Sequence, residues 1–391
     1  MPISSTNPHR VALFRQNLMG GGAEKVIVTL ARHFAKDGFE VDLVLSRAEG
    51  PLLETVPPQV RIVDLKAAQI AQKRALKLPT SFQSTSSLPK LVRYLQKERP
   101  TALLSASHYS NEVAILAKQL AGIPTRVVVS EHIALSIQAK GVEQVSSRFA
   151  PLAARLLYSR ADGIVAVSQG VAKDLAQVAH LNTNRIQVIY NPVITSELAE
   201  KAKQPVEHPW FAPDNPPVVL GVGRLVKQKD FSNLIRAFAQ VRQFREARLV
   251  ILGSGREQNR LKALVKELNL EDEVALLGFV KNPYAYMARA GVFVLSSGWE
   301  GLPTVLIEAM AVGTPVVSTN CPSGPEEILN NGQYGELVPI ANSRALAEAI
   351  VQVLSGKTKS VDVAWLEQFT LETALQKYQQ VLNLSLSECV N

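Results

Sequence analysis

Glu300 and Glu308 stand on either side of a Gly-Leu-Pro-Thr turn in the stretch SSGWEGLPTVLIEAMAVGTPVV, residues 296–317. The turn directly precedes a predicted helix, so the free N–H groups there and the hydroxyl of Thr304 can bind an anion. Glu308 lies one turn into this helix, in an apolar run that predicts a buried helix, where a lone charge is costly. Ribose hydroxyls beside a bound phosphate would supply donors to Glu308, and Glu300 could accept from sugar hydroxyls. The alternative is a pair of structural acids, one capping the loop and the other paired with a basic side chain.

A second segment, LGVGRLVKQKDF at residues 220–231, ends a predicted strand with a Gly-x-Gly turn. Gly223 lets the backbone approach a ligand closely, and Arg224 and Lys229 beside it can clamp a diphosphate. The fingerprint of dinucleotide-binding dehydrogenases requires a further glycine where this chain has Val226, so it is poorly matched. The alternative is a solvated basic turn before a helix.

The elements that position these residues follow the pattern of parallel α/β sheets, in which short β-branched runs alternate with longer amphipathic segments. In the first half we predict strands at 10–16, 40–46, 101–107, 125–131, 163–168 and 186–191, and helices at 22–37, 86–99, 111–121, 148–160 and 168–179. After a proline-rich stretch at 208–217 the pattern restarts, with strands at 217–223, 247–253, 273–279, 291–297, 314–319 and 335–339, and helices at 231–244, 256–269, 303–312, 343–354 and 365–384. We therefore predict an α/β protein of two doubly wound, Rossmann-like domains facing each other across a cleft. The motifs lie at strand ends, where such folds bind ligands.

Size and composition agree with two soluble domains. The chain has 391 residues, which is too long for one ordinary hydrophobic core. Of these residues 47% are apolar and 19% are charged, as in a well-packed soluble protein. We place the domains at 1–195 and 196–370. No apolar run approaches the roughly eighteen residues of a membrane span, and the N-terminus lacks the apolar core of a signal peptide. The two cysteines, Cys321 and Cys389, form no disulfide or metal framework. We expect a cytoplasmic, reducing compartment.

Charge is distributed unevenly between the two halves. Residues 1–195 carry 23 Lys and Arg against 13 Asp and Glu, a net charge of +10, whereas the remainder carries 19 against 21, a net charge of −2. Such an asymmetry indicates an anionic partner for the first half alone, either nucleic acid or a phospholipid surface. An aromatic content of 6% offers no obvious platform for stacking bases, so nucleic acid is not our expectation.

The motifs together resemble the signature of family 4 retaining glycosyltransferases, which have the GT-B fold. Glu300 and Glu308 with seven residues between them, followed by AMAVGTPVVST, resemble the signature itself. GVGRLVKQKDFSNLIRAF is similar to the donor-phosphate segment of the family, and LGFVKNPYAYMARAGVFVLSS to its base-binding stretch. CPSGPEEIL and GELVPIANSRALAEAI follow in the expected order. The resemblance covers essentially the whole chain and is most specific over 218–350. It also implies that residues 371–391 form a C-terminal helix that returns to the first domain.

The resemblance assigns roles to the donor-side residues. Arg224 and Lys229 correspond to the pair that neutralises the donor diphosphate. Glu308 corresponds to the ribose ligand and Glu300 to the acid that contacts the transferred sugar. At the helix start, the backbone N–H groups of Gly301 and Leu302 assist, and Pro303 and Thr304 belong to the same donor site. Phe279 and Val280 correspond to the base-contacting positions, which act largely through the main chain.

In the first half, MGGGAEKV at 19–26 resembles the glycine loop of the family, where Gly21 and Gly22 approach the donor phosphate and the acceptor. Three glycines are more than a strand-to-helix turn needs, which favours a site over a simple turn. His132 occupies a strand-end position where family members often place a histidine near the reacting sugar, with Glu131 beside it. His108 is a weaker candidate, and the alternative for both is a structural histidine.

The implied reaction is displacement of a nucleoside diphosphate from a nucleotide-sugar by an acceptor hydroxyl, with retention of configuration. The sugar would be a hexose or N-acetylhexosamine, and a UDP-sugar is preferred to a GDP-sugar. No Asp-x-Asp follows a strand, so we expect no metal and no cofactor, with cationic side chains and helix N-termini in their place. The alternative is a nucleotide-sugar-binding GT-B protein that is non-catalytic or an epimerase.

The basic first half suits a glycan or lipid-linked acceptor at an anionic membrane surface, with the enzyme peripheral on the inner face of the cytoplasmic membrane. The segments 87–99 and 146–160 place leucines on one helical face with Lys and Arg around them. Ordinary sheet-covering helices have the same pattern, and that alternative stays open. The sequence does not predict the oligomeric state.

Overall fold

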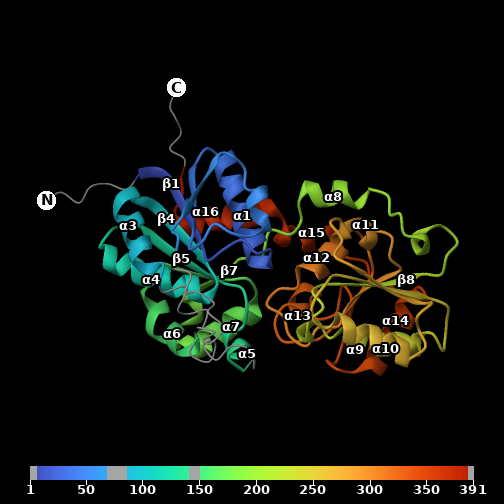
Figure 1. Ribbon diagram of the computed structural model, residues 1–391. Coiled ribbons are helices and arrows are strands. Elements are labelled where there is room, and N and C mark those ends of the chain that lie inside the picture. Colours follow the sequence, from blue (N-terminus) through green and yellow to red (C-terminus); the bar gives the residue numbers. More distant parts are fainter. Residues whose placement is uncertain (1–6, 68–85, 141–149, 386–391) are drawn as a thin grey trace, which may run out of the picture. The chain divides into compact units, whose positions relative to one another are not determined.

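The computed structural model describes residues 7–67, 86–140 and 150–385 (Figure 1). They form two compact units, one made of the described residues up to Pro192 together with those from Glu372 onward, and the other of Val193–Leu371. Each unit is built on one parallel sheet with helices on both faces. The start of the predicted helix 148–160 lies outside the described residues.

The sheet of the first unit has seven strands in the order β3-β2-β1-β4-β5-β6-β7, all parallel. Their bounds are β1 Asn7–Arg15, β2 Glu40–Leu45, β3 Val60–Asp64, β4 Pro100–Ala106, β5 Arg126–Glu131, β6 Gly163–Ala166 and β7 Ile186–Val188. The prediction omits β3, because this short edge strand contains the charged Arg61 and Asp64 and leaves four of its five residues at least partly exposed. The other six strands are confirmed.

Helices cover both faces of this sheet. One face carries α1 (Gly22–Lys36) and α16 (Leu371–Leu382); the other carries α3 (Leu88–Glu98), α4 (His108–Ala121), α6 (Ala150–Leu157) and α7 (Gln169–Ala179). The short α5 (Leu135–Lys140) packs on α6 and α7. In α16 the residues spaced four apart, Ala374, Tyr378 and Leu382, are buried in the core that α1 and the strands form. This periodicity is why the last helix belongs to the first unit.

The predicted helix 365–384 is wrong as a single element. The segment contains α15 (Val363–Leu366), a 3₁₀ turn over Glu367–Phe369, and then α16. The break follows Phe369, which is fully buried and whose carbonyl accepts hydrogen bonds from the backbone N–H groups of Val193 and Ile194, each at 3.0 Å. Apolar periodicity continues through the break, and therefore the sequence pattern does not reveal it.

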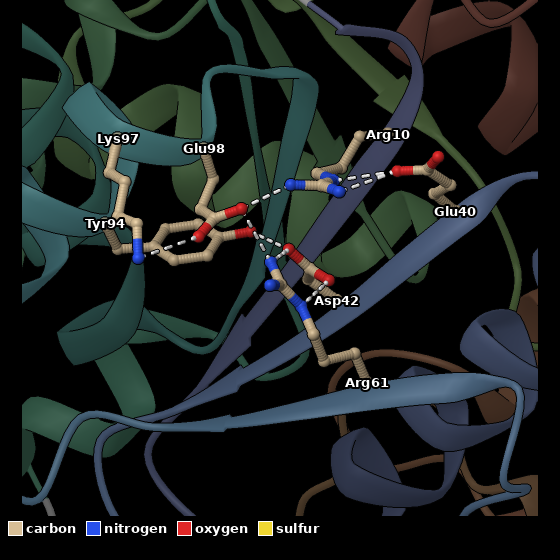
Figure 2. A network of polar contacts seen from close by, with 7 residues as sticks. All are labelled: Arg10, Glu40, Asp42, Arg61, Tyr94, Lys97 and Glu98. Atoms are coloured by element: carbon tan, nitrogen blue, oxygen red, sulfur yellow. Dashed lines mark hydrogen bonds and ion pairs between the residues drawn. The ribbon is translucent and has the colours of Figure 1, made fainter.

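A polar network fixes α3 to the amino-terminal ends of β1, β2 and β3 (Figure 2). Asp42 is 2% exposed, and its two oxygens accept from Arg61 at 2.7 and 2.5 Å and from the Tyr94 hydroxyl at 2.6 Å. Glu98, at the end of α3, accepts from Arg10 and Arg61. The buried carboxylate is thus fully compensated, and α3 is held at the sheet edge opposite to the carboxyl ends of the strands.

The sheet of the second unit has six parallel strands in the order β10-β9-β8-β11-β12-β13. Their bounds are β8 Val218–Val222, β9 Arg248–Leu252, β10 Val274–Gly278, β11 Val292–Leu295, β12 Val316–Thr319 and β13 Glu336–Val338. One face carries α9 (Phe231–Val241), α10 (Gln258–Glu267) and α14 (Ser343–Leu354); the other carries α11 (Pro283–Met287), α12 (Thr304–Ala311) and α13 (Pro325–Ile328), while α8 (Ser196–Ala202) packs on α11. All six predicted strands are confirmed, as are the helices predicted near α9, α10, α12 and α14.

Candidate active site

The candidate site of the second unit lies where the strand order reverses, between β8 and β11. These strands are neighbours in the sheet, so the loops that follow them meet at their carboxyl ends. Hydrogen bonds join the two loops: the N–H of Gly298 donates to the carbonyl of Gln228 at 2.8 Å, and the hydroxyl of Ser296 donates to the carbonyl of Lys229 at 2.7 Å. The side-chain amide of Gln228 donates to the carbonyl of Trp299 at 2.8 Å. The two predicted motifs therefore form one structure.

Lys229 and Glu300 form a buried ion pair at this junction. The ammonium nitrogen lies 2.6 Å from Oε1 of Glu300, and the hydroxyl of Ser297 donates to the same oxygen at 2.6 Å. The amide of Gln228 donates to Oε2 at 3.3 Å. Glu300 is 5% exposed, and such a carboxylate requires this compensation. The sequence predicted separate roles for Lys229 and Glu300; the structure brings the two into contact.

Arg224 and the glycines around it have a different environment. The Arg224 side chain is exposed and makes no hydrogen bond or ion pair with any residue that the structure describes. Gly223 leaves room for the Lys229 stem, since a Cβ on Gly223 would lie 3.3 Å from Cε of the lysine. Gly253, at the end of β9, has a φ of +137°, and a Cβ there would lie 1.9 Å from the carbonyl oxygen of Gly223. This close approach fixes the loop that carries Arg224.

Helix α12 begins at Thr304, next to Glu300. Gly301, Leu302 and Pro303 are buried ahead of it, and a Cβ on Gly324 would lie 2.4 Å from Cδ of Pro303. A tightly packed turn thus holds the helix start beside the Lys229–Glu300 pair.

The helix that carries Glu308 is buried as predicted, whereas Glu308 itself is only half-buried. Leu306, Ile307, Ala309 and Met310 face the interior, while Glu308 shares a less buried face of α12 with Thr304. Burial raises the pKa of the Tyr284 hydroxyl, on α11, and the negative charge of Glu308 raises the pKa of this hydroxyl further. Tyr284 was not predicted, and only the packing of α11 on α12 reveals it.

Phe279 and Val280 follow β10, at the same carboxyl edge of the sheet as the other residues predicted to bind the donor. Phe279 is 78% exposed, and Val280 is partly buried. Gly278, with a φ of +76°, turns the chain away from the strand at this point.

In the first unit the candidate residues gather at the carboxyl ends of β1, β4 and β5. His132 directly follows β5, and its Nε2 lies 3.2 Å from Oγ of Ser130, which in turn lies 3.5 Å from the Tyr378 hydroxyl on α16. Burial, together with the positive charge of Arg15, lowers the pKa of His132 to about 3. The same two causes lower the pKa of His108 to about 4. Both imidazoles are therefore neutral at pH 7.

Glu131 forms a buried polar cluster beside His132. It is 1% exposed, and its Oε1 accepts from the Tyr158 hydroxyl and, at 3.0 Å, from Nδ2 of Asn111. Its Oε2 is buried and has no hydrogen-bond partner among the described residues. Burial raises the pKa of Glu131 to about 8, against the opposing effect of these two hydrogen bonds. Tyr158 and Asn111 come from separate helical segments, which explains why the sequence did not single them out.

The glycine loop precedes α1. Gly21 is the residue before the helix, and a Cβ there would lie 2.2 Å from Oε2 of Glu24. Glu24 is buried and pairs with Arg15, whose Nη1 donates to the carbonyl of Ala106 at 2.5 Å. A Cβ on Gly22, in contrast, would meet nothing within 4 Å. The Arg15–Glu24 pair was not predicted, although an arginine at a strand end and an acid in the following helix are visible in the sequence.

Within residues 7–67, 86–140 and 150–385, no cluster of three or more His, Cys, Asp or Glu side chains is arranged to hold a metal ion. Within the same ranges, every helix is too short or too polar to cross a membrane.

Residues 203–364 match the family model of glycosyl transferases group 1, and residues 20–197 match that of glycosyltransferase family 4. An N-acetylgalactosamine-N,N'-diacetylbacillosaminyl-diphospho-undecaprenol 4-alpha-N-acetylgalactosaminyltransferase of Campylobacter jejuni is 31% identical over 349 residues, which cover 88% of this chain and 90% of the relative. The chain belongs to glycosyltransferase family 4.

This glycosyltransferase is also 27% identical to the lipopolysaccharide core biosynthesis glycosyltransferase LpsE of Rhizobium meliloti, over 93% of this chain and 96% of the relative. Among solved structures, sucrose-phosphate synthase from Thermosynechococcus elongatus has a TM-score of 0.79 at 22% identity, covering 96% of this chain and 100% of that one. Anabaena HepE in complex with UDP and glucose has a TM-score of 0.75 at 21% identity, covering 96% and 99%. At such identities these structures inform on the fold alone, and the predicted GT-B fold of two doubly wound α/β domains is confirmed.

Proposed function

We propose that this glycosyltransferase moves a hexose or N-acetylhexosamine from a UDP-sugar to a hydroxyl of a glycan or lipid-linked acceptor, with retention of configuration. The observation that carries the proposal is the Lys229–Glu300 pair beside the exposed Arg224, because it puts cations for a diphosphate and an acid for sugar hydroxyls at one strand switch point. The names of two relatives support a role in the synthesis of cell-surface polysaccharide, lipopolysaccharide or glycolipid. One is named as a transferase acting on a diphospho-undecaprenol, and the other as a glycosyltransferase of lipopolysaccharide core biosynthesis.

In the proposed reaction the acceptor oxygen bonds to the anomeric carbon as the bond to the β-phosphate oxygen breaks. Negative charge develops on the leaving phosphate, so Arg224, Lys229 and the N–H groups at the start of α12 act mainly in the transition state. The acceptor proton passes to the leaving phosphate on the same face of the sugar, which retains configuration. The phosphate then leaves as UDP.

We propose that the transfer needs no divalent ion, with Arg224 and Lys229 in the place that a metal would take at the diphosphate. Initial rates should be equal with excess EDTA and with added Mg²⁺. A loss of turnover in EDTA that Mg²⁺ restores would overturn this part of the proposal.

The donor is tested by thermal shift against UDP, GDP and a panel of UDP- and GDP-sugars, followed by release of free nucleotide in the presence of undecaprenyl-diphosphate glycans or lipopolysaccharide-core acceptors. We expect UDP-sugars to raise the melting temperature more than GDP-sugars and an acceptor to accelerate UDP release. Stabilisation by a UDP-sugar without UDP release on any acceptor would instead favour a binding protein, and interconversion of the donor sugar would favour an epimerase.

We also propose that the first unit contacts an anionic membrane surface on the cytoplasmic side. The net charge of +10 over residues 1–195, most of which belong to this unit, supports the proposal. On α6, Leu152 and Leu156 are 55% and 59% exposed, one helical turn apart, with the exposed Arg155 and Arg160 nearby. The apolar stripe of α3 is not exposed like that of α6, since Leu91 and Leu95 are buried, so α3 is an ordinary sheet-covering helix.

The membrane proposal is tested by co-sedimentation with vesicles. Vesicles of phosphatidylglycerol should co-sediment the protein and vesicles of phosphatidylcholine should not; equal sedimentation would contradict the proposal.

A further inference from the structure

The carboxylate of Glu300 is held by three side chains, and only one of them is a charged partner. Oε1 accepts from Lys229 at 2.6 Å and from the Ser297 hydroxyl at 2.6 Å. Oε2 accepts from the Gln228 amide at 3.3 Å. A carboxylate oxygen has two acceptor positions, so both positions of Oε1 are occupied. Oε2 retains one.

Gln228 is committed to this arrangement by both of its amide hydrogens. Its Nε2 donates to the carbonyl of Trp299 at 2.8 Å as well as to Oε2 of Glu300, and its own main-chain carbonyl accepts from the N–H of Gly298 at 2.8 Å. A single residue thus makes three hydrogen bonds to the loop that carries Glu300. No sequence motif singled out Gln228 or Ser297.

We propose that Gln228 and Ser297 are positioning residues of the transfer reaction. Together they orient the Glu300 carboxylate so that the remaining acceptor position of Oε2 receives a hydroxyl of the transferred sugar. This inference rests on the proposed role of Glu300 as the sugar-contacting acid. Neither residue needs to touch the substrate, because each acts through Glu300.

The consequence is a specific kinetic signature. A displacement of about 1 Å in a positioning group can lower turnover by about a hundredfold. Gln228→Met keeps the volume of the side chain and removes both amide donors. We expect it to lower kcat by about 10- to 100-fold and to leave the dissociation constant of UDP within about twofold. Ser297→Ala removes one of two donors to Oε1 while Lys229 stays, so its effect should be smaller.

The matched control is Gln240→Met, in α9 of the same unit. Gln240 is also partly buried, and its amide donates to the Arg236 carbonyl at 3.4 Å and to the Ser343 hydroxyl at 3.1 Å. This variant loses two comparable hydrogen bonds, neither of which involves Glu300 or the loop that carries it. It should keep wild-type kcat.

The experiment measures kcat and KM for each variant. Isothermal titration calorimetry then gives the affinity for UDP and for the UDP-sugar that binds the wild type most tightly in the donor panel. The proposal is supported if Gln228→Met loses kcat and also loses the affinity gain of the UDP-sugar over UDP, while Gln240→Met loses neither. It is overturned if Gln228→Met retains wild-type kcat, or if its affinities for UDP and the UDP-sugar fall equally. If Gln228→Met does not fold, Ser297→Ala decides by the same two criteria. If the wild type releases no UDP with any acceptor, the proposed function is contradicted instead. The titration then still tests the positioning of Glu300.

Discussion

The ammonium nitrogen of Lys229 lies 2.6 Å from Oε1 of Glu300, although the two residues are 71 positions apart in the sequence. Their side chains are only 14% and 7% exposed. The pair joins the loop after β8 to the loop after β11 and places a cation and an acid at the point where a nucleotide-sugar is proposed to bind. Because the pair is buried, substitution of either residue is expected to affect stability as well as the proposed activity.

Lys229→Met should lower the free energy of unfolding by about 3 kcal/mol, because it leaves the Glu300 carboxylate buried without its charged partner. Glu300→Gln should cost less, since the more exposed lysine can turn toward water. The double variant should be more stable than the sum of the single effects predicts, as urea unfolding of all four proteins would show. Strict additivity would mean that the two groups do not interact in solution.

Arg224→Ala should lower turnover by about a hundredfold, the effect of losing one preorganised donor to the leaving phosphate. Its melting temperature should stay within about one degree of wild type, because the exposed guanidinium has no side-chain partner among the described residues. Lys227→Ala is the control, since Lys227 is an exposed cation on the same loop. Equal turnover of Arg224→Ala and wild type would remove Arg224 from the chemistry.

His132→Gln should become more stable relative to wild type as the pH falls from 7 to 5. The unfolded chain takes up a proton on this imidazole near its ordinary pKa of 6.5, whereas burial holds the pKa in the folded protein at about 3. The unfolded state therefore binds more protons in this range, and wild type loses at most about 1.4 kcal/mol per pH unit through this group. Parallel stability curves for the two proteins, measured by urea unfolding at pH 5, 6 and 7, would contradict the shift.

Glu131→Gln should show the opposite sign. The folded protein keeps the Glu131 proton up to a pKa of about 8, whereas the unfolded chain loses it near 4.5. The folded state binds more protons between these values, so wild type should lose stability relative to the variant as the pH rises from 5 to 8, by at most about 1.4 kcal/mol per unit. Chemical denaturation across this range is the measurement. If the stability of wild type relative to the variant increases as the pH rises, Glu131 is ionised in the folded protein.

Gly253→Ala should destabilise the second unit by more than about 4 kcal/mol, because the new Cβ would meet the Gly223 carbonyl oxygen in a backbone conformation that alanine rarely adopts. Gly356→Ala is the matched control: its φ of +92° is similarly unfavourable, but nothing lies within 4 Å of the added Cβ. It should cost about 1–2 kcal/mol. Thermal or urea unfolding gives the loss of stability of each variant. Equal losses would mean that the loop carrying Arg224 moves to accommodate the added methyl group.

The sequence by itself determined the class of fold and most of its elements. Buried parallel strands and sheet-covering helices have local signatures, and six strands of each unit were found from apolar runs alone. The phosphate and sugar motifs were also visible, because glycines, cations and acids at strand ends are local features. Where the signal is weak or continuous, prediction failed: the exposed edge strand β3 has no apolar run, and the break after Phe369 leaves the helical periodicity intact.

Only the tertiary structure decided which of these residues meet. Lys229 contacts Glu300 because β8 and β11 are neighbours in the sheet, and strand order is a property of the whole unit rather than of either segment. The same holds for Gln228, for the Tyr158–Glu131 contact and for the partial exposure of Glu308. Burial and hydrogen bonding depend on what packs against a residue, and those neighbours are distant in the chain.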